Sequence, residues 1–585
     1  MIVDSVPLDV QESSEENEVQ IYLTSSKEKE ENSNTYHVLV PREEHITKTS
    51  LEAKMTELKN FEYYDVYEVV EKPKDTNIIT TQWVIVDKEV PGQMQPMRKA
   101  RLCMRGDQEK NVENISKDAP TVNKVNIKLM LMEAVRKGWD IESSDVTRAF
   151  LQTSNIDRNV FVKPPIEAGL PTNKVWKLKR PAYGLIDAAH SFFVNYADNL
   201  IALGCETCKM DNAIFYNFEG GSKLTDESRS LNGIIASHID DSLIVSNDKM
   251  KEDVVNKMKE RFTYGTQETL PFRYVGLNID KEKGKVIINQ DHFVESIIPP
   301  DLGKISSNKK SWVLDDEFQT KYRSLVSKLN ILSMSARPDI SFEVKVLTTK
   351  YGKASKLDLM KALKVLEKVK RKTTKITIPN MGAIKDCVLV AYSDAATKKI
   401  DNAFSVAGHV IFLVNKKTNA ATPITWSSKK IERVVNSSLA AETLAVVKTI
   451  GVIYFIKEIM KQMYGRVDGD IACVAITDSK DLHEAVHNVK NTNDKRLLGD
   501  ILQIKQAIAV DGIIEELRHV PSHEMLADSL TKEGANGEEL LNCVRTGVLH
   551  VTGGLDVVKS KKFEASAWRK LIQAQSVDFK DDGQV

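Results

Sequence analysis

The chain has 585 residues, which corresponds to about three to four domain-sized units. It carries 82 basic and 82 acidic residues, so the net charge is zero. This balance gives no indication of a strongly charged partner for the chain as a whole. Six cysteines are too few for a disulfide framework, and the single Cys205-x-x-Cys208 pair favours two ordinary thiols over a zinc site. Without an evident signal peptide or an apolar run of about 18 residues, we expect an intracellular protein in a reducing environment with no membrane partner.

The N-terminal segment is acidic. Nine acidic residues accompany only two lysines within residues 1–31, and residues 1–45 show no hydrophobic periodicity. This composition predicts a disordered linker over 1–45.

Residues 46–300 alternate between helix and strand patterns, which predicts an α+β region. Glycines mark the expected ends of two helices. The predicted elements are, in chain order, a helix from about Thr49, strands over 79–90 and 98–106, a helix over 126–138 ending at Gly138, a strand and then a helix over 139–152, and a helix over 190–204 ending at Gly204.

Residues 301–380 are predicted to be helical and basic. Between residues 341 and 380, eleven basic residues accompany three acidic ones. Such a stripe is either a footprint for a phosphate backbone or the solvated face of a helix, and the charge alone favours neither.

Residues 381–535 show a clearer order of elements. Three strands are followed by a long helix, a strand, a helix, a strand and a final helix, which predicts a mixed sheet with helices packed on its faces. The tail over 536–585 has no pattern that predicts a role.

Two adjacent aspartates, Asp240 and Asp241, interrupt an apolar run in "ASHIDDSLIVSND". Asp-Asp pairs also occur at 315–316 and 581–582, so the dipeptide alone indicates no more than a surface turn. The flanking "GIIA" and "LIV" predict two strands with the acids at the turn between them. Asp145 ends another predicted strand, and beside the pair it would complete a two-metal site, although spacing alone does not establish one.

Four further carboxylates occupy ends of the elements predicted in 381–535. Each alone is better explained as an ordinary strand-end or helix-start residue, but four in these positions favour a shared site. Converged carboxylates repel one another unless a cation neutralises them, and Mg²⁺ is the usual partner of such oxygen clusters. Two such ions can activate a water and stabilise the leaving oxygen of a phosphodiester. The four are Asp394 near the end of the first strand, Glu442 in the first turns of the long helix, Asp478 at the end of the fourth strand and Asp528 on the last helix.

A series of short motifs in a fixed order resembles one known family. The chain is similar, over about residues 49–535, to the reverse transcriptase–RNase H portion of a Ty1/copia-type retrotransposon Pol polyprotein. The motifs are "TTQWVIVDKE", "RKARLCMRGD", "SSDVTRAFLQ", "VFVKPP", "YGL", "IDDSLIVSN", "YVGLNI", "YRSLVSKLNIL…ARPDISFEV", "YSDAA", "ITWSSKK", "SSLAAETLA", "TDS" and "LADSLTK".

The resemblance implies a fold class of α+β and α/β type. Residues 46–300 would be the fingers and palm of a right-hand-like reverse transcriptase, 301–380 its thumb and connection, and 381–535 an RNase H-like mixed-sheet domain. The basic stripe of the thumb would then hold the duplex backbone.

The resemblance also implies site residues and cofactors. Each of two active sites would hold two Mg²⁺ ions, with Mn²⁺ as an alternative. The implied metal ligands are Asp145, Asp240 and Asp241 in the palm, and Asp394, Glu442, Asp478 and Asp528 in the RNase H domain.

Residues that bind substrate follow from the same motifs. Phe150 is expected to exclude a 2′-OH by its bulk, with a core phenylalanine as the alternative. Lys99 and Arg101 are both candidates for holding the triphosphate, and Gly184 of "YGL" is a further substrate-binding candidate. His519 or His523 would be a proton shuttle, although an ordinary surface histidine is the favoured interpretation.

The sequence departs from the family pattern at two places. His238 replaces the tyrosine that usually lies two residues before the aspartate pair and supports the primer end. The pattern "YGL-K-Q-x-P-R" reads here as Tyr183 to His190 with Ile186, Asp187, Ala189 and His190 replacing Lys, Gln, Pro and Arg. All seven of the expected metal-binding acids are present.

The implied function is an RNA-directed DNA polymerase with RNase H activity. Its partners would be an RNA template, a DNA primer, the RNA–DNA hybrid, dNTPs and other Pol or Gag products of the element. It would act in the cytoplasm within a virus-like particle, with the nucleus as an alternative. The competing hypotheses are a decayed or domesticated nucleic-acid-binding fragment without polymerase activity, and a protein that retains RNase H activity only.

Overall fold

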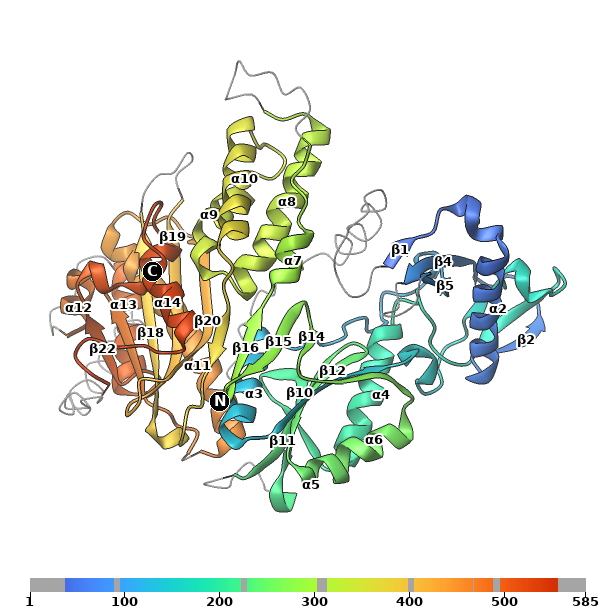
Figure 1. Cartoon of the computed structure of the whole chain (residues 1–585), viewed down its shortest axis with the longest axis horizontal. Helices are drawn as coiled ribbons and strands as arrows, with labels where there is room; N and C mark the ends of the chain where they lie inside the picture. Colours follow the sequence, from blue (N-terminus) through green and yellow to red (C-terminus); the bar gives the residue numbers. More distant parts are fainter. Residues whose placement is uncertain are drawn as a thin grey trace, which may run out of the picture. The chain divides into compact units, whose positions relative to one another are not determined.

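The computed structural model describes residues 37–88, 95–221, 229–301, 313–397, 404–466, 468–487 and 495–555 (Figure 1). Residues 1–36 of the predicted linker and 556–585 of the tail lie outside the described residues. The chain divides into two compact units. The first unit comprises 1–118 and 148–195, and the second comprises 119–147 and 196–585. The domain boundaries derived from the sequence stay predictions.

The first unit contains two small sheets and a helix. The helix α2 (Lys48–Tyr63) begins close to the predicted Thr49 and packs against β5 through Leu58 and Phe61. One sheet is antiparallel with order β1-β4-β5, and the other has order β2-β8-β7-β3. The strands are β1 (His37–Leu39), β4 (Thr81–Lys88), β5 (Met97–Met104), β2 (Tyr67–Glu71), β8 (Lys174–Leu178), β7 (Phe161–Val162) and β3 (Ile78–Ile79).

A six-stranded sheet with order β13-β6-β12-β11-β10-β9 opens the second unit. Its strands are antiparallel, and α3 packs on it through β6 and β12. The predicted hairpin around the aspartate pair is confirmed as β11 and β12. The elements are β13 (Tyr264–Thr269), β6 (Asp140–Val146), β12 (Asp241–Ser246), β11 (Leu231–His238), β10 (Asp211–Phe218), β9 (Cys205–Cys208), α3 (Lys124–Lys137), α5 (Asp248–Met250) and α6 (Asn256–Arg261). The helix α4 (Ala188–Ala202) begins in the first unit and ends in the second.

A four-stranded sheet and a group of helices follow in the chain. The sheet has order β14-β15-β16-β17, and α8, α9 and α10 lie side by side around one apolar core (Figure 1). The elements are β14 (Phe272–Tyr274), β15 (Leu277–Glu282), β16 (Lys285–Asn289), β17 (Ile376–Ile378), α7 (Asp291–Ser296), α8 (Asp316–Ser335), α9 (Ser341–Thr348) and α10 (Lys356–Arg371).

The C-terminal sheet has five strands in the order β20-β19-β18-β21-β22. The first three are antiparallel, and β21 and β22 run parallel to β18, so the sheet is mixed as predicted. The long helix α11 packs against β18, β19 and β21, and α13 packs against α11. The elements are β18 (Cys387–Ala396), β19 (Val406–Asn415), β20 (Ala421–Lys430), α11 (Ser438–Tyr464), β21 (Cys473–Thr477), α12 (Lys480–His487), α13 (Lys495–Ala509), β22 (Glu516–His519) and α14 (Glu538–Thr546).

Two expected helices are shorter turns. Residues after Asp145 form the 3-10 helix η3 (Ala149–Gln152), and the segment with Asp528 forms the 3-10 helix η10 (Leu526–Leu530). Each buries its apolar side chains within a few residues, so neither segment needs a full α-helix to cover a core. The predicted final helix of this region is therefore wrong in type, although its position is right.

The helix α11 corrects the expectation that no segment could cross a membrane. Its apolar window has a mean hydropathy of 1.7, and by length and composition it would suffice for a span. However, 56% of that window is buried inside the protein, as in a core helix, so the composition is weak evidence for a membrane.

The helix α3 connects the two large sheets of the second unit. It contacts β12 on one side and β20 on another, and one continuous apolar core includes residues of both sheets. Lys128 of α3 is buried, and its Nζ donates to Ile424 O at 3.2 Å and lies 3.9 Å from the centre of the Trp426 ring. The Tyr464 hydroxyl of α11 donates to Glu133 Oε2 of α3 at 2.7 Å.

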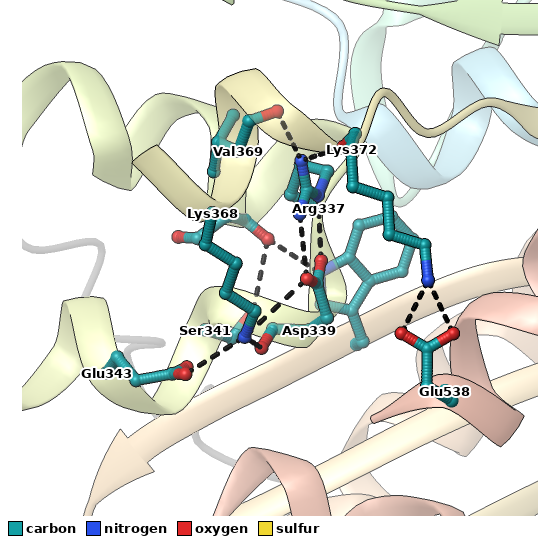
Figure 2. Close-up of polar contacts among 10 residues, drawn as sticks. Arg337, Asp339, Ser341, Glu343, Lys368, Val369, Lys372 and Glu538 are labelled. Atoms are coloured by element: carbon teal, nitrogen blue, oxygen red, sulfur yellow. Dashed lines mark hydrogen bonds and ion pairs between the residues drawn. The ribbon is translucent and has the colours of Figure 1, made fainter. Parts of the chain in front are cut away.

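A buried ion pair joins the turn after α8 to the end of α10 (Figure 2). Separately, Trp426 Nε1 of β20 donates to Ser333 O of α8 at 2.7 Å, which connects these helices to the C-terminal sheet. The Arg337 guanidinium donates twice to the Asp339 carboxylate, both at 2.8 Å, and once to Lys372 O at 2.8 Å at the end of α10. Lys372 Nζ in turn reaches the Glu538 carboxylate of α14 at 2.5 Å. The "ARPDI" motif therefore has a structural role.

The predicted fold class, α+β and α/β, is confirmed by the mixture of helices and sheets.

Candidate functional site

The three acids expected in the palm lie together on the six-stranded sheet. The strand β12 pairs with β6 so that Asp241 is directly opposite Asp145. Asp240 lies in the turn just before β12, and its carbonyl accepts a hydrogen bond from Val146 N at 2.9 Å. Carboxylate oxygens of the three residues lie within 4.8 Å of one another.

The turn that presents this cluster has only two residues between its paired ends. His238 is paired with Asp241, which leaves Ile239 and Asp240 as the loop. Ile239 has φ of 59°, a left-handed conformation that a β-branched residue rarely adopts. The surrounding sheet therefore holds the turn in a strained form, as is common at functional sites. Thr121 forms an isolated bridge with His238, which fixes the end of β11.

Negative charge accumulates in this cluster. Burial, followed by the negative charges of Asp240, Asp145 and Glu268, raises the pKa of Asp241 to about 7. A hard cation would reverse this effect, because carboxylate oxygens are the ligands that Mg²⁺ prefers. The donor set therefore fits the expected metal.

Sequence reasoning missed Gly265, which lies beside the cluster on β13. A Cβ at this position would lie 3.1 Å from Asp145 Oδ2 and 2.4 Å from Thr147 Oγ1. Only glycine leaves room for the Asp145 carboxylate in its present position, and no local pattern in "FTYGTQ" signals this.

Three acids of the C-terminal sheet form a second cluster. Asp394 lies on β18, Asp478 directly follows the neighbouring parallel strand β21, and Glu442 lies in the first turns of α11. Their carboxylate oxygens are again within 4.8 Å of one another. Asp394 is fully buried, and Glu442 is 5% exposed.

Burial and mutual repulsion also shift the carboxyl groups of this second cluster. Burial and then the charges of Asp394 and Asp478 raise the pKa of Glu442 to about 9. Burial raises the pKa of Asp394 to about 6 against the lowering effect of Lys532 and Thr531. Within the described residues, Glu442 Oε2 has no hydrogen-bond partner, which leaves it available to a cation.

Asp528 is not one of the three clustered acids, but Lys532 links it to them by ion pairs. Lys532 Nζ lies 2.6 Å from Asp528 Oδ1, 3.3 Å from Asp394 Oδ1 and 3.8 Å from Asp478 Oδ2. The Thr531 hydroxyl donates to Asp394 Oδ2. Neither Thr531 nor Lys532 was predicted, although both belong to the quoted motif "LADSLTK".

The expected triphosphate-binding residues lie in the first unit. Lys99 and Arg101 are both on β5, and burial together with the charges of Arg101 and Arg148 lowers the pKa of Lys99. Arg148, which the sequence analysis did not select, therefore adds a third cation to this group. Such a group suits a polyphosphate.

Phe150 and Gly184 occupy ordered positions in the same unit. The Phe150 ring packs edge to face on Tyr183 at 5.2 Å between centroids, and it is half-buried. Gly184 has φ of 85°, and a Cβ there would lie 2.2 Å from Met104 O, so a close backbone approach requires glycine. The substrate-binding roles of both residues stay predictions.

Asp187, one of the departures from the family pattern, belongs to an ion-pair cluster. Arg158 donates to both carboxylate oxygens of Asp187, and it also donates to Glu109 Oε1 at 2.8 Å. His190 Nδ1 lies 2.7 Å from Asp118 O. The replaced positions are thus integrated in the fold of the first unit.

The two histidines considered as proton shuttles differ in their surroundings. His523 is 80% exposed and lies 3.6 Å from Glu524 Oε1. His519 ends β22, and its ring centroid is 6.1 Å from that of His483. Their roles stay predictions.

The basic stripe is partly neutralised within the protein. Lys368, Arg371 and Lys372 each form an ion pair with an acidic residue. Lys364 and Lys370 of α10 are exposed and form no ion pair in the part of the chain that the structure describes. Both lysines are therefore available to contact a phosphate backbone, as is the exposed Lys353 of the same stripe.

Cys205 and Cys208 lie at the two ends of β9 and are buried. Burial raises the pKa of the Cys205 thiol to about 12. The pKa of the Cys208 thiol is raised for the same reason. Both thiols are therefore protonated near neutral pH.

Comparison with known proteins finds sequence similarity over a large part of the chain. Residues 64–310 match the family described as "Reverse transcriptase (RNA-dependent DNA polymerase)". The chain is 26% identical over 489 residues to the "Retrovirus-related Pol polyprotein from transposon RE1" of Arabidopsis thaliana. This alignment covers 79% of this chain and 31% of that protein. It is 23% identical over 440 residues to the corresponding polyprotein from transposon TNT 1-94 of Nicotiana tabacum, which covers 71% of this chain and 32% of that protein.

The chain is therefore similar to Pol polyproteins from transposons over most of its length, and its residues 64–310 match a reverse transcriptase family. The family inferred from the motifs is thereby confirmed. The chain spans about a third of the length of these curated relatives. Among solved structures it is similar to a foamy viral protease-reverse transcriptase in complex with an RNA/DNA hybrid, at 12% identity and a TM-score of 0.44, covering 92% of this chain and 66% of that one.

Proposed function

We propose that this protein is an RNA-directed DNA polymerase that also degrades the RNA strand of an RNA–DNA hybrid. The observation that supports the proposal best is the presence of two separate carboxylate clusters, one of which lies inside the reverse transcriptase match. Both clusters have raised carboxyl pKa values, so both favour the binding of cations.

In the polymerase site, Asp145, Asp240 and Asp241 would hold Mg²⁺ or Mn²⁺. The bound ions would lower the pKa of a primer 3′-OH and neutralise charge on the triphosphate. The pairing of β6 with β12 would orient these acids. In the first unit, Lys99, Arg101 and Arg148 form a group of cations that would attract a triphosphate. Phe150 would limit the space next to the sugar.

In the hybrid-cleaving site, Asp394, Glu442 and Asp478 would hold the same kind of ion. Asp528 would act beside them through its contact with Lys532. Near neutral pH the Glu442 carboxyl, whose pKa is raised to about 9, must lose its proton when an ion binds, so metal binding here releases protons.

The proposed substrates are an RNA template with a DNA primer, the resulting hybrid, and dNTPs. We further propose that the protein acts with other Gag and Pol products in cytoplasmic virus-like particles. The exposed lysines of α10 that form no ion pair within the described residues support the proposal that this helix contacts the hybrid backbone.

Primer extension tests the polymerase activity. The wild-type protein should extend a DNA primer on an RNA template with dNTPs and Mg²⁺, and Asp240→Asn should abolish the extension. Asp315→Asn is a matched control because Asp315 caps α8, and asparagine caps helices equally well. A folded wild-type protein that binds the hybrid but adds no nucleotide would overturn this part of the proposal.

A second candidate function is hybrid cleavage without polymerisation. His238 in place of the expected tyrosine, and the replacement of the expected cations at 186–190, favour this alternative. It predicts hybrid cleavage that Asp478→Asn abolishes, with no extension even after His238→Tyr. Extension by the wild-type protein would exclude it.

A further inference from the structure

Lys532 lies where a cation would bind in the C-terminal carboxylate cluster. Its ammonium contacts three carboxylates from three different elements, with Nζ 2.6 Å from Asp528, 3.3 Å from Asp394 and 3.8 Å from Asp478. An ordinary surface ion pair joins one lysine to one carboxylate, whereas this ammonium is shared among three. The side chain is 37% exposed, so solvent reaches it and it has room to move outward.

The backbone around Lys532 is held firmly against the sheet. Gly408 of β19 is paired with Asp394, and a Cβ at Gly408 would lie 2.7 Å from Thr531 and 2.8 Å from Leu530. The Thr531 hydroxyl donates to Asp394, and Lys532 N donates to Asp528 O at 2.9 Å. The position of the lysine backbone is therefore fixed, while its long side chain retains rotatable bonds.

We propose that Lys532 is the internal counter-cation of the C-terminal site, which holds its carboxylates together without metal and must move aside when a metal ion enters. This inference rests on the proposed function of the site. Two positive charges cannot both remain a few ångströms apart among the same oxygens without a large repulsion. Lys532 is thus a positioning residue whose charge sets how tightly the site binds metal.

The proposal has two opposite consequences for a variant that lacks the charge. Lys532→Gln leaves the carboxylates without a counter-charge, so the metal-free protein should unfold at a lower temperature. The same change removes the ammonium that competes with Mg²⁺ for the carboxylates. The Mg²⁺ dissociation constant should therefore fall on the order of tenfold, because a like charge within a few ångströms of the ion is lost. Lys532→Arg keeps the charge and should retain the wild-type affinity.

Calorimetric titration with Mg²⁺ provides the first test. The titration uses full-length protein carrying Asp240→Asn and Asp241→Asn, which removes binding at the other cluster. Lys480→Gln is the matched control, because Lys480 lies close in sequence to Asp478 but forms its ion pair with Glu484. Tighter binding by Lys532→Gln alone would support the proposal, and equal dissociation constants for the parent, Lys532→Gln and Lys480→Gln would overturn it.

The same titration separates this inference from the proposed function. If Asp478→Asn removes binding but Lys532→Gln does not change it, only the counter-cation role is wrong. If the parent protein binds no Mg²⁺ at all, the proposed metal site itself is wrong, and this inference with it.

A second measurement needs no variant at position 532. Lysines of the wild-type protein are labelled with an amine-reactive reagent, and the extent of labelling at each lysine is read by mass spectrometry with and without Mg²⁺. Displacement of the ammonium from its carboxylates should increase labelling of Lys532 several-fold in Mg²⁺ and leave Lys480 unchanged. Equal labelling of Lys532 in both conditions would contradict the proposal.

Discussion

At the scale of single residues, the protein places acids where a cation would stabilise them. Asp241 is opposite Asp145 in the register of two strands, and its pKa is raised to about 7 by burial and neighbouring carboxylates. Ile239 contributes by accepting a left-handed backbone in the turn. The arrangement costs stability without metal, and the strand pairing on both sides maintains it.

Gly265→Ala tests how closely the sheet packs against Asp145. The added methyl group would lie 3.1 Å from Asp145 Oδ2 and 2.4 Å from Thr147 Oγ1, so the carboxylate must shift. Because a small misplacement of a catalytic group can cost about a hundredfold in rate, we expect primer extension to fall by about that factor. Hybrid cleavage by the C-terminal site serves as the internal control and should be unchanged. Equal extension rates would show that Asp145 has more freedom than its packing indicates.

The raised pKa of Asp241 predicts a pH dependence of stability in EDTA. A group whose pKa is higher in the folded state binds its proton more tightly there, so its contribution is present below about pH 4, the unfolded value. That contribution disappears as the pH rises through about 7. Melting temperatures measured from pH 4 to 8 should therefore fall less steeply for Asp241→Asn than for the wild type. Parallel curves would contradict the predicted protonation of Asp241.

At the scale of secondary-structure elements, local signals in the sequence predicted a good part of the structure. Gly138 ends α3 and Gly204 follows α4 with left-handed backbones, and the hairpin around the aspartates has the predicted strands. These features depend on neighbouring residues only. The segment at Asp528 was predicted as a helix but is a 3-10 turn, because it packs against β19 at Gly408 from a distant part of the chain.

The same distinction applies to the site residues. The acids of the two clusters could be predicted because motif and topology both place them at the ends of strands or at the start of a helix. Gly265, Arg148 and Lys532 could not, because their importance comes from contacts formed only in the folded sheet or group of cations. A glycine or a lysine in isolation carries no local signal for such a contact.

The helix α10 provides a prediction about nucleic-acid binding. Lys364→Gln combined with Lys370→Gln should weaken binding to an RNA–DNA hybrid equally for different sequences. The slope of log affinity against log salt should decrease by about 0.9 for each phosphate group that the variant no longer neutralises. Lys249→Gln with Lys257→Gln is a matched control, because these lysines are exposed on α5 and α6. An unchanged slope for the α10 variant would leave this helix without a role in holding the hybrid.

At the scale of the second unit, the six-stranded sheet and the C-terminal sheet share one core. Buried polar contacts cross between them through α3, including Lys128 with Ile424 O and Glu133 with Tyr464. Trp426 of β20 similarly donates to Ser333 O of α8, and Arg337 joins the turn after α8 to the end of α10 (Figure 2). The two carboxylate clusters of this unit are therefore carried by parts that stabilise each other.

Truncation after Asn380 tests this mutual stabilisation. The shortened chain would expose the face of α3 that packs on β20, and it would remove Ile424 from Lys128 and Tyr464 from Glu133. We expect it to be insoluble or to melt at a clearly lower temperature than the full chain, as followed by circular dichroism. A soluble fragment with an unchanged melting temperature would show that the polymerase part folds independently.

The central claim is that one chain carries two independent metal-dependent active sites. The most direct measurement follows primer extension and cleavage of a labelled RNA template in the same reaction, for the wild type, Asp240→Asn and Asp478→Asn. The account predicts that Asp240→Asn loses extension and still cleaves a preformed hybrid, whereas Asp478→Asn extends the primer and leaves the RNA intact. Loss of both activities in either folded variant, or persistence of both in each, would contradict it.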